Sequence, residues 1–171
     1  NLKRLRKKSA IETITTGRPA TQMPPFGEKL TTAQISTLVD HIYSPLPDVP
    51  NWTEVEISNS HKQFVPLNQL PTQPQHSADP LNLFFVVEAG DHHATILDGD
   101  KLEPITRFKT RFALHGGAKY SPDGRFVYFA TRDGWVTLFD LHSMQQVAEI
   151  RAGINTRNIA ISSDGKLVAV G

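Results

Sequence analysis

The sequence contains no cysteine among its 171 residues. This absence excludes disulfide bonds, thiolate nucleophiles and thiolate metal sites from the chain. It does not by itself identify a redox compartment. Whatever chemistry these residues perform, it does not depend on a thiolate.

Long apolar runs are also missing, since no stretch approaches the ~18 apolar residues of a membrane span. With 39% hydrophobic and 20% charged residues, the composition is that of a folded soluble protein with one ordinary domain or two small ones. There is no secretory signal pattern and no initiator methionine. The chain opens at Asn1 in a helical pattern and closes at Gly171 in an apolar strand pattern, so we expect an internal fragment of a longer protein.

Negatively charged residues are absent from the first eight positions. The same positions carry five positive charges: Lys3, Arg4, Arg6, Lys7 and Lys8. Such a run is compatible with a nucleic-acid arm or with a helix on a membrane surface. However, no aromatic residue is interleaved with it, and Leu2 and Leu5 offer only a narrow apolar stripe. We therefore expect a solvated helix face that could dock an acidic redox partner, and no nucleic-acid partner.

Two short helices with a proline-rich loop between them are predicted at the start of the chain. The apolar positions of residues 1–16 follow a helical period, and residues 18–27 form a loop rich in proline and glycine. A second helix is predicted over 32–43, because Thr31 and Gln34 have the spacing of a capping box. Two helices of this size cannot cover their apolar stripes alone, so we expect a large apolar group against them.

Residues 45–80 contain seven prolines and show no sustained periodicity. Because each proline presets its φ angle, this composition predicts an extended, semi-rigid connector. His61 and His76 lie in it without partners at metal-ligand spacing, and we expect both at the surface.

From Leu81 onward the apolar residues follow the period of β-strands. The predicted strands are 83–87, 94–99 and 105–108, followed by 126–130, 136–140 and 147–150. A Ser-Pro-Asp-Gly turn ending at Gly124 is answered 41 residues later by Ser-Ser-Asp-Gly, ending at Gly165. Short strands recurring at this period are typical of β-propeller blades. Two blades cannot close a propeller, so we expect further blades after Gly171.

The stretch from Gly17-Arg18-Pro19 through Met23-Pro24 and Phe26-Gly27 resembles the C-terminal half of a class I cytochrome c domain. The resemblance implies that the Met23 thioether is an axial ligand of a haem c iron. It also implies that the Cys-x-x-Cys-His attachment motif lies upstream of Asn1. From the residue type alone, Met23 could equally be a gap-filling core side chain.

Cytochrome tail, proline-rich connector and propeller together resemble the cytochrome cd1 family. The resemblance implies a mostly β fold in which residues 81–171 form about the first two blades of an eight-bladed propeller that binds haem d1. Residues 1–47 would be the C-terminal part of the cytochrome c domain, and residues 48–80 the linker.

Ala113-Leu114-His115 matches the position of the proximal haem d1 ligand in that family. From the residues alone two interpretations stay open. A lone histidine is more often structural than a ligand. The alternative is an axial ligand to a flat macrocycle lying over Gly116 and Gly117, where missing side chains permit close approach.

The resemblance also implies cations for the haem d1 carboxylates. Arg157 matches a family arginine with this role, and Lys119 stands where the nitrite reductases commonly have an arginine. Arg132 is expected to be only a charge at the end of a strand. No catalytic residue is assigned.

Two further groups of residues invite a functional interpretation. Adjacent histidines on a strand point to opposite faces, so His92 and His93 cannot chelate one ion, although one could face the propeller's rim. Four aspartates recur at turns and strand ends, where Asx-type hydrogen bonds explain them: Asp98, Asp123, Asp140 and Asp164.

The family resemblance implies a periplasmic oxidoreductase, of which this fragment alone is inactive. Residues 115–124 are closer to the branch that oxidises dihydro-haem d1 to haem d1, with haem c as electron acceptor, because the reductases tend to carry a larger residue and an arginine after the histidine. Its redox partner would be a small c-type cytochrome or a cupredoxin. The alternatives are a nitrite reductase of denitrification and a scaffold propeller without cofactor, in which Met23 and His115 merely pack.

Overall fold

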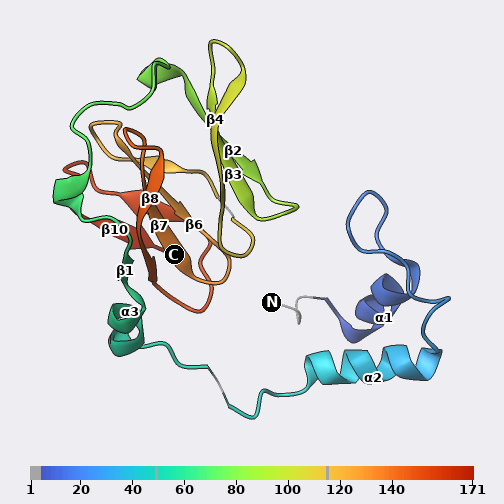
Figure 1. Cartoon of the computed structure of the whole chain (residues 1–171). Coiled ribbons are helices and arrows are strands. Elements are labelled where there is room, and N and C mark those ends of the chain that lie inside the picture. The colour runs from blue at the N-terminus through green and yellow to red at the C-terminus, as the bar shows by residue number, and fades with distance from the viewer. Residues whose placement is uncertain (1–4, 49, 115) are drawn as a thin grey trace. The chain divides into compact units, whose positions relative to one another are not determined.

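The computed structural model describes residues 5–48, 50–114 and 116–171 (Figure 1). The chain divides into two compact units, residues 1–49 and 50–171, and each is described by itself. Within the described ranges, no helix is both long and apolar enough to cross a membrane.

The first unit contains the helices α1 (Lys7–Thr16) and α2 (Thr32–Tyr43). The predicted start of α1 is wrong, because Arg6 is extended and serves as the N-cap. The bounds of α2 agree with the prediction, and its capping box is confirmed. The Thr31 hydroxyl accepts the Gln34 N–H at 3.3 Å, while the Gln34 side chain accepts the Thr31 N–H at 2.9 Å.

The second unit begins with the connector, which is not simply extended as predicted. It contains the helix α3 (Glu54–Ser60), the short strand β1 (Lys62–Gln63) and two 3₁₀ turns, η2 (Leu67–Gln69) and η3 (Pro80–Asn82). A capping box of Thr53 and Glu56 starts α3. Strand β1 pairs antiparallel with β8 (Gln145–Arg151). The connector is therefore docked along the edge of a sheet.

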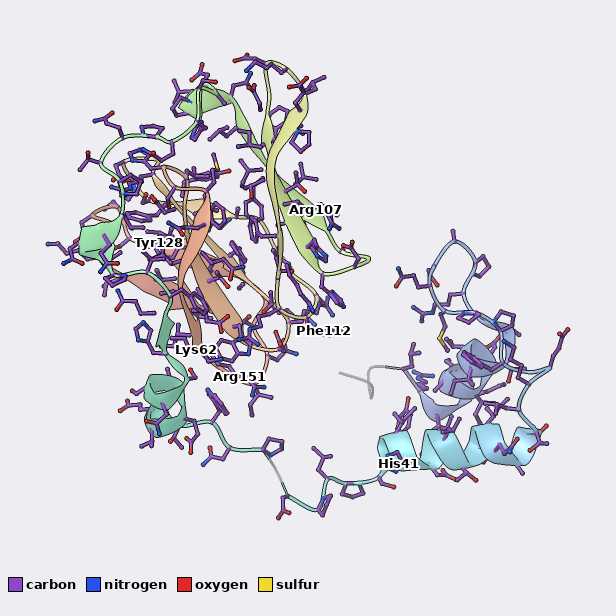
Figure 2. The ribbon with its side chains drawn as sticks, in the orientation of Figure 1. His41, Lys62, Arg107, Phe112, Tyr128 and Arg151 are labelled. Carbon is purple, nitrogen blue, oxygen red and sulfur yellow. The ribbon has the colours of Figure 1, made fainter. Side chains whose placement is uncertain are left out.

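Side chains reinforce this docking near Lys62 and Arg151, which Figure 2 labels. The Trp52 indole N–H donates to the Arg151 carbonyl at 2.9 Å, and the Arg151 guanidinium lies 4.5 Å from the centre of the Trp52 ring. Farther along, His76 Nε2 lies 3.1 Å from the Leu141 carbonyl. His61 is exposed as predicted, but His76 is partly buried, so the prediction of a surface residue there is wrong.

The remaining strands form three antiparallel groups, and the six predicted strands are confirmed with small shifts of their ends. The first sheet consists of β2 (Leu83–Glu88), β3 (His93–Asp98) and β4 (Glu103–Lys109). The second has the order β1-β8-β7-β6-β5, with β5 (Lys119–Tyr120), β6 (Phe126–Ala130) and β7 (Trp135–Asp140). Strands β9 (Ile159–Ile161) and β10 (Val168–Val170) pair with each other.

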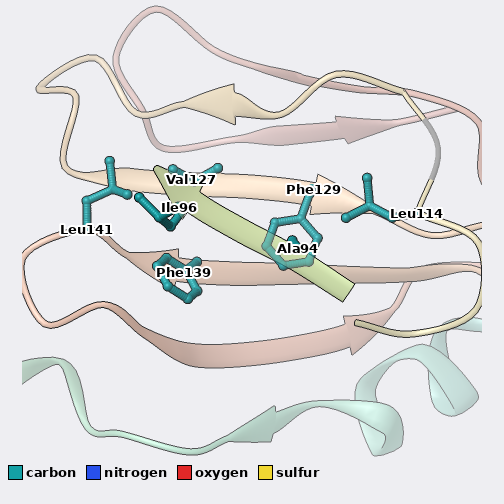
Figure 3. Close-up of a cluster of buried hydrophobic side chains, with 7 residues drawn as sticks. All are labelled: Ala94, Ile96, Leu114, Val127, Phe129, Phe139 and Leu141. Carbon is teal, nitrogen blue, oxygen red and sulfur yellow. The ribbon is translucent and has the colours of Figure 1, made fainter. Parts of the chain in front are cut away.

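The two larger sheets bury a shared core, shown in Figure 3. Its members are Ala94, Ile96, Leu114, Val127, Phe129, Phe139 and Leu141. The rings of Phe108 and Phe139 stack across the two sheets with their centres 4.5 Å apart. Burying side chains of this size is worth roughly 1.5 to 3 kcal/mol each. Because Leu114 belongs to this core, the crossover from the first sheet to the second is anchored in it.

The four recurring aspartates make the predicted turn contacts. Asp98 Oδ1 accepts the Asp100 N–H at 3.0 Å, and Asp140 Oδ2 accepts the Ser143 N–H at 3.0 Å. Asp123 and Asp164 each accept a backbone N–H from two residues ahead. These carboxylates stabilise turns, as Asx-type bonding predicts.

Asp140 also does more than stabilise its turn. It is fully buried and accepts a hydrogen bond from Arg125 Nε at 2.7 Å. Burial raises the pKa of the Asp140 carboxyl, but hydrogen bonds from Arg125 and Ser143 outweigh burial and hold the pKa below its ordinary value. Arg125 in turn donates to the Pro71 carbonyl at 2.9 Å, which ties the connector to the second sheet.

Candidate functional site

The crossover between β4 and β5, residues 110–118, contains the residue predicted to bind the macrocycle iron. That residue, His115, lies outside the described residues. The residues on both sides of it are described. Leu114 is buried and forms an isolated antiparallel bridge with Thr131.

The turn after β6 holds the crossover from one side. The Arg132 N–H donates to the carbonyls of Phe112 and Ala113, at 3.2 and 3.1 Å. Thr131, one residue earlier, is fully buried, and its carbonyl accepts the hydroxyl of buried Thr156 at 2.8 Å. The turn after β6 is therefore hydrogen-bonded both to the crossover at Phe112 and Ala113 and to the segment around Thr156.

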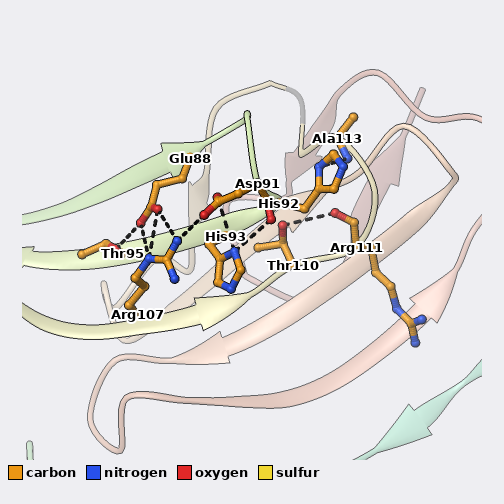
Figure 4. Close-up of polar contacts among 9 residues, drawn as sticks. All are labelled: Glu88, Asp91, His92, His93, Thr95, Arg107, Thr110, Arg111 and Ala113. Carbon is orange, nitrogen blue, oxygen red and sulfur yellow. Dashed lines mark hydrogen bonds and ion pairs between the residues drawn. The ribbon is translucent and has the colours of Figure 1, made fainter.

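The turn between β2 and β3 holds the crossover from the other side, as Figure 4 shows. His92 Nδ1 accepts the Ala113 N–H at 3.2 Å, and the His92 carbonyl accepts the Thr110 N–H at 2.7 Å. The ring centres of His92 and Phe112 are 5.1 Å apart. His92 thus touches three crossover residues. Sequence reasoning missed this role, because the partners lie about twenty positions away.

His93 has different partners from His92. Its Nδ1 lies 2.9 Å from the Asp91 carbonyl. The pair was predicted to lie on a strand, but His92 belongs to the turn, with φ 60°, and β3 begins only at His93. Among the residues that the structure describes, no group of three or more His, Cys, Asp or Glu could hold a metal ion.

Beyond residue 115, the structure brings together the predicted glycines and cations. Gly116 has φ +87°, and a Cβ there would lie 3.1 Å from the Arg157 carbonyl. A Cβ on Gly117 would lie 3.8 Å from the Lys119 Nζ. Both glycines and Arg157 are exposed, while Lys119 is partly buried. The two glycines therefore form exposed backbone next to the main chain at Arg157 and the side chain of Lys119.

Asn158, next to Arg157, belongs to the same neighbourhood and was not predicted. Its side-chain oxygen would lie 3.7 Å from a Cβ on Gly116 and accepts the Ile159 N–H at 3.0 Å. In β5, burial raises the pKa of the Tyr120 phenol above its ordinary value.

In the first unit, the loop that carries Met23 closes onto the end of α1. The Met23 carbonyl accepts the Arg18 N–H at 2.9 Å. Gly17 has φ 71°, and a Cβ there would lie 2.7 Å from the Met23 carbonyl, so only glycine fits this position. Met23 itself is partly buried.

The helices of this unit leave apolar side chains uncovered. Among its described residues, the buried hydrophobic ones are Ala10, Ile35 and Val39. Ile11 and Leu38 remain 37% and 44% exposed. The helices α1 and α2 thus carry apolar surface that the described residues of this unit leave uncovered.

Comparison with known proteins places these features in context. The family model "Cytochrome D1 heme domain" matches residues 78–171. The chain is 57% identical to the "Dihydro-heme d1 dehydrogenase" of Pseudomonas aeruginosa over 171 residues, all of this chain and 35% of that protein. It is 26% identical to the "Nitrite reductase" of Stutzerimonas stutzeri over 140 residues, 80% of this chain and 25% of that protein.

A solved structure also resembles the chain. It is "Dihydro-heme d1 dehydrogenase NirN in complex with DHE", with a TM-score of 0.79 and 57% sequence identity. The match covers 99% of this chain and 36% of that one. The chain thus spans 35% of the length of the dehydrogenase and 25% of the reductase.

Proposed function

The chain belongs to the cytochrome D1 heme domain family, and on this basis we propose that it is part of an oxidoreductase that converts dihydro-haem d1 to haem d1. The electrons pass to haem c. The observation that carries the proposal is the contrast between two relatives. Identity to the dehydrogenase is 57% over the whole chain, whereas identity to the nitrite reductase is 26% over 140 residues.

The proposed architecture has three parts. Residues 81–171 form about the first two blades of an eight-bladed propeller, preceded by the linker at 48–80. Two sheets that bury a shared core support this assignment, because a blade buries its faces only against its neighbours. Residues 1–47 form the C-terminal part of a class I cytochrome c domain, supported by the uncovered apolar stripes of α1 and α2.

The crossover residues hold the tetrapyrrole in this proposal. His115 would bind its iron, and Gly116 and Gly117 would allow the ring to approach the backbone. Arg157 and Lys119 pair with its carboxylates. The macrocycle undergoes the dehydrogenation, and the chain's own residues bind and orient it.

Met23 supplies an axial thioether to haem c, whose attachment motif lies upstream. Haem c, when bound, provides a one-electron acceptor. Removing two hydrogen atoms from dihydro-haem d1 releases two electrons and two protons, so haem c must pass electrons on during turnover. A small c-type cytochrome or a cupredoxin is the proposed acceptor, and the periplasm the proposed location.

Arg157 offers a direct test of the carboxylate contacts. Arg157→Ala is expected to weaken tetrapyrrole binding by about ten- to a hundredfold, because a hydrogen bond to a charged group is worth roughly 1.5 to 3 kcal/mol. Spectroscopic titration of the full-length protein measures this, and the haem c spectrum should not change.

The matched control for this test is Arg132→Ala. Arg132 is also exposed and lies in a neighbouring turn, and its hydrogen bonds to the described crossover residues Phe112 and Ala113 come from its backbone N–H. Wild-type affinity is expected for this variant. Equal affinity of the Arg157 variant and the wild type would remove Arg157 from the site.

The activity itself is tested by offering the full-length protein dihydro-haem d1 and, separately, nitrite with a reductant. We expect conversion of dihydro-haem d1 to haem d1 without rapid production of nitric oxide. Rapid nitrite turnover with no action on the dihydro compound would make the protein a nitrite reductase. A purified full-length protein without haem absorption would instead support the scaffold alternative.

A further inference from the structure

The turn between β2 and β3 and the crossover each contain a residue with an unusual backbone conformation. His92, with φ 60°, and Ala113, with φ 50°, both adopt the left-handed backbone region that residues with side chains rarely occupy. The two residues are joined by the hydrogen bond from the Ala113 N–H to His92 Nδ1. Strained backbone of this kind persists only where surrounding contacts enforce it, and such strain gathers at functional sites.

We propose that His92 is a positioning residue that holds the crossover backbone at Ala113. This inference rests on the proposed function, in which His115 binds the tetrapyrrole iron. Ala113 lies two positions before that residue in the sequence, so a change in the backbone at Ala113 is expected to alter binding of the iron.

The contacts fix His92 as well as the crossover. Its carbonyl accepts the Thr110 N–H at 2.7 Å, which holds its backbone, and its ring packs against Phe112 with the ring planes at 54°. Nδ1 then faces the Ala113 N–H. Nδ1 accepts this hydrogen bond and therefore carries no proton. In the neutral ring the proton is then on Nε2.

The opposite side of the same segment is held independently. The Arg132 N–H binds the Phe112 and Ala113 carbonyls, and Leu114 bridges Thr131. Residues 112–114 are therefore clamped between turns from two different sheets. Of the two clamps, the Arg132 contacts use only backbone atoms, whereas the His92 contact to Ala113 depends on a side chain and can be removed by substitution.

Two substitutions separate the hydrogen bond from the backbone conformation. His92→Asn keeps an acceptor, because the Asn side-chain oxygen takes the place of Nδ1, and asparagine tolerates positive φ. His92→Gly suits the backbone at least as well but removes the acceptor. His93→Ala is the matched control, since His93 contacts Asp91 rather than the crossover.

The first measurement is amide hydrogen exchange over residues 110–114 in the full-length protein. The Ala113 amide in His92→Gly is expected to exchange about tenfold or more faster than in the wild type, because the hydrogen bond from its N–H to His92 Nδ1 is lost. Wild-type exchange is expected for His92→Asn and His93→Ala. Unchanged protection in His92→Gly would overturn the proposed hydrogen-bond clamp.

The second measurement is the low-spin spectrum and oxidation rate of bound dihydro-haem d1. His92→Gly is expected to slow oxidation by about tenfold or more, since small misplacements of a positioned group cost rate steeply. His92→Asn should restore most of this loss, and the haem c spectrum should stay constant throughout. Faster exchange at Ala113 with wild-type spectrum and rate would make His92 merely structural and refute the positioning role.

The outcomes also distinguish this proposal from the proposed function. If the wild-type protein neither binds nor oxidises the tetrapyrrole, the proposed function fails while the exchange measurement still reports on the clamp. If the wild type is active and His92→Gly matches it, only the positioning role fails.

Discussion

His115→Ala is expected to abolish the low-spin absorption of haem d1 in the full-length protein. The imidazole is the proposed strong-field ligand on the proximal face, and no other group in the proposed site replaces it. Binding should fall far less than the spectrum changes. The proposed contacts of Arg157 and Lys119 to the carboxylates do not involve the imidazole, and the exposed Gly116-Gly117 backbone is unchanged by the substitution.

Added imidazole provides a second test of the iron ligand with the same variant. It should enter the space left by the side chain and restore the low-spin spectrum of His115→Ala. The control is His61→Ala, which changes an exposed connector histidine and should leave the spectrum as it is. A low-spin spectrum that survives His115→Ala without imidazole would assign the ligand elsewhere.

Met23→Ala is expected to lower the reduction potential of haem c by on the order of 0.1 V or more, since axial ligands tune haem potentials over about 0.8 V. The thioether favours reduced iron more than a water or nitrogen replacement does. The sulfur-to-iron absorption should also disappear. Potentiometric titration and visible spectroscopy of the full-length protein measure both effects.

The chain offers a close control, because Met144 is its only other methionine. Met144 packs against the core of the two sheets, so Met144→Leu should leave the haem c spectrum and potential intact. Met23→His should keep a six-coordinate iron while lowering the potential. An unaltered spectrum in Met23→Ala would show that another residue ligates haem c.

Features set by local sequence were predictable. The capping box of Thr31 and Gln34 acts within one helical turn, and the Asx-type contacts of Asp98 span two residues, so the sequence window contains every atom involved. The strands followed because alternation of apolar residues is also a local property. The start of α1 was misjudged, because apolar periodicity does not locate an N-cap.

Features set by distant partners were not predictable. Strand β1 exists because Lys62 pairs with Glu149 in β8, a partner 87 positions away, and the density of prolines obscured the capping box of Thr53 and Glu56. The approach of Arg157 to Gly116 was expected only through the family resemblance. His92 escaped notice because its acceptor role depends on a neighbour brought close by folding.

The proposed function makes these residues part of an enzyme that takes electrons from dihydro-haem d1 and places them on haem c. It is tested most directly by mixing anaerobic full-length protein, with haem c oxidised and in excess, with dihydro-haem d1 and following both absorption spectra together. Haem d1 should form with two haem c reduced per macrocycle, because dehydrogenation releases two electrons and each haem c iron accepts one. Dihydro-haem d1 that stays unchanged beside oxidised haem c would contradict the account.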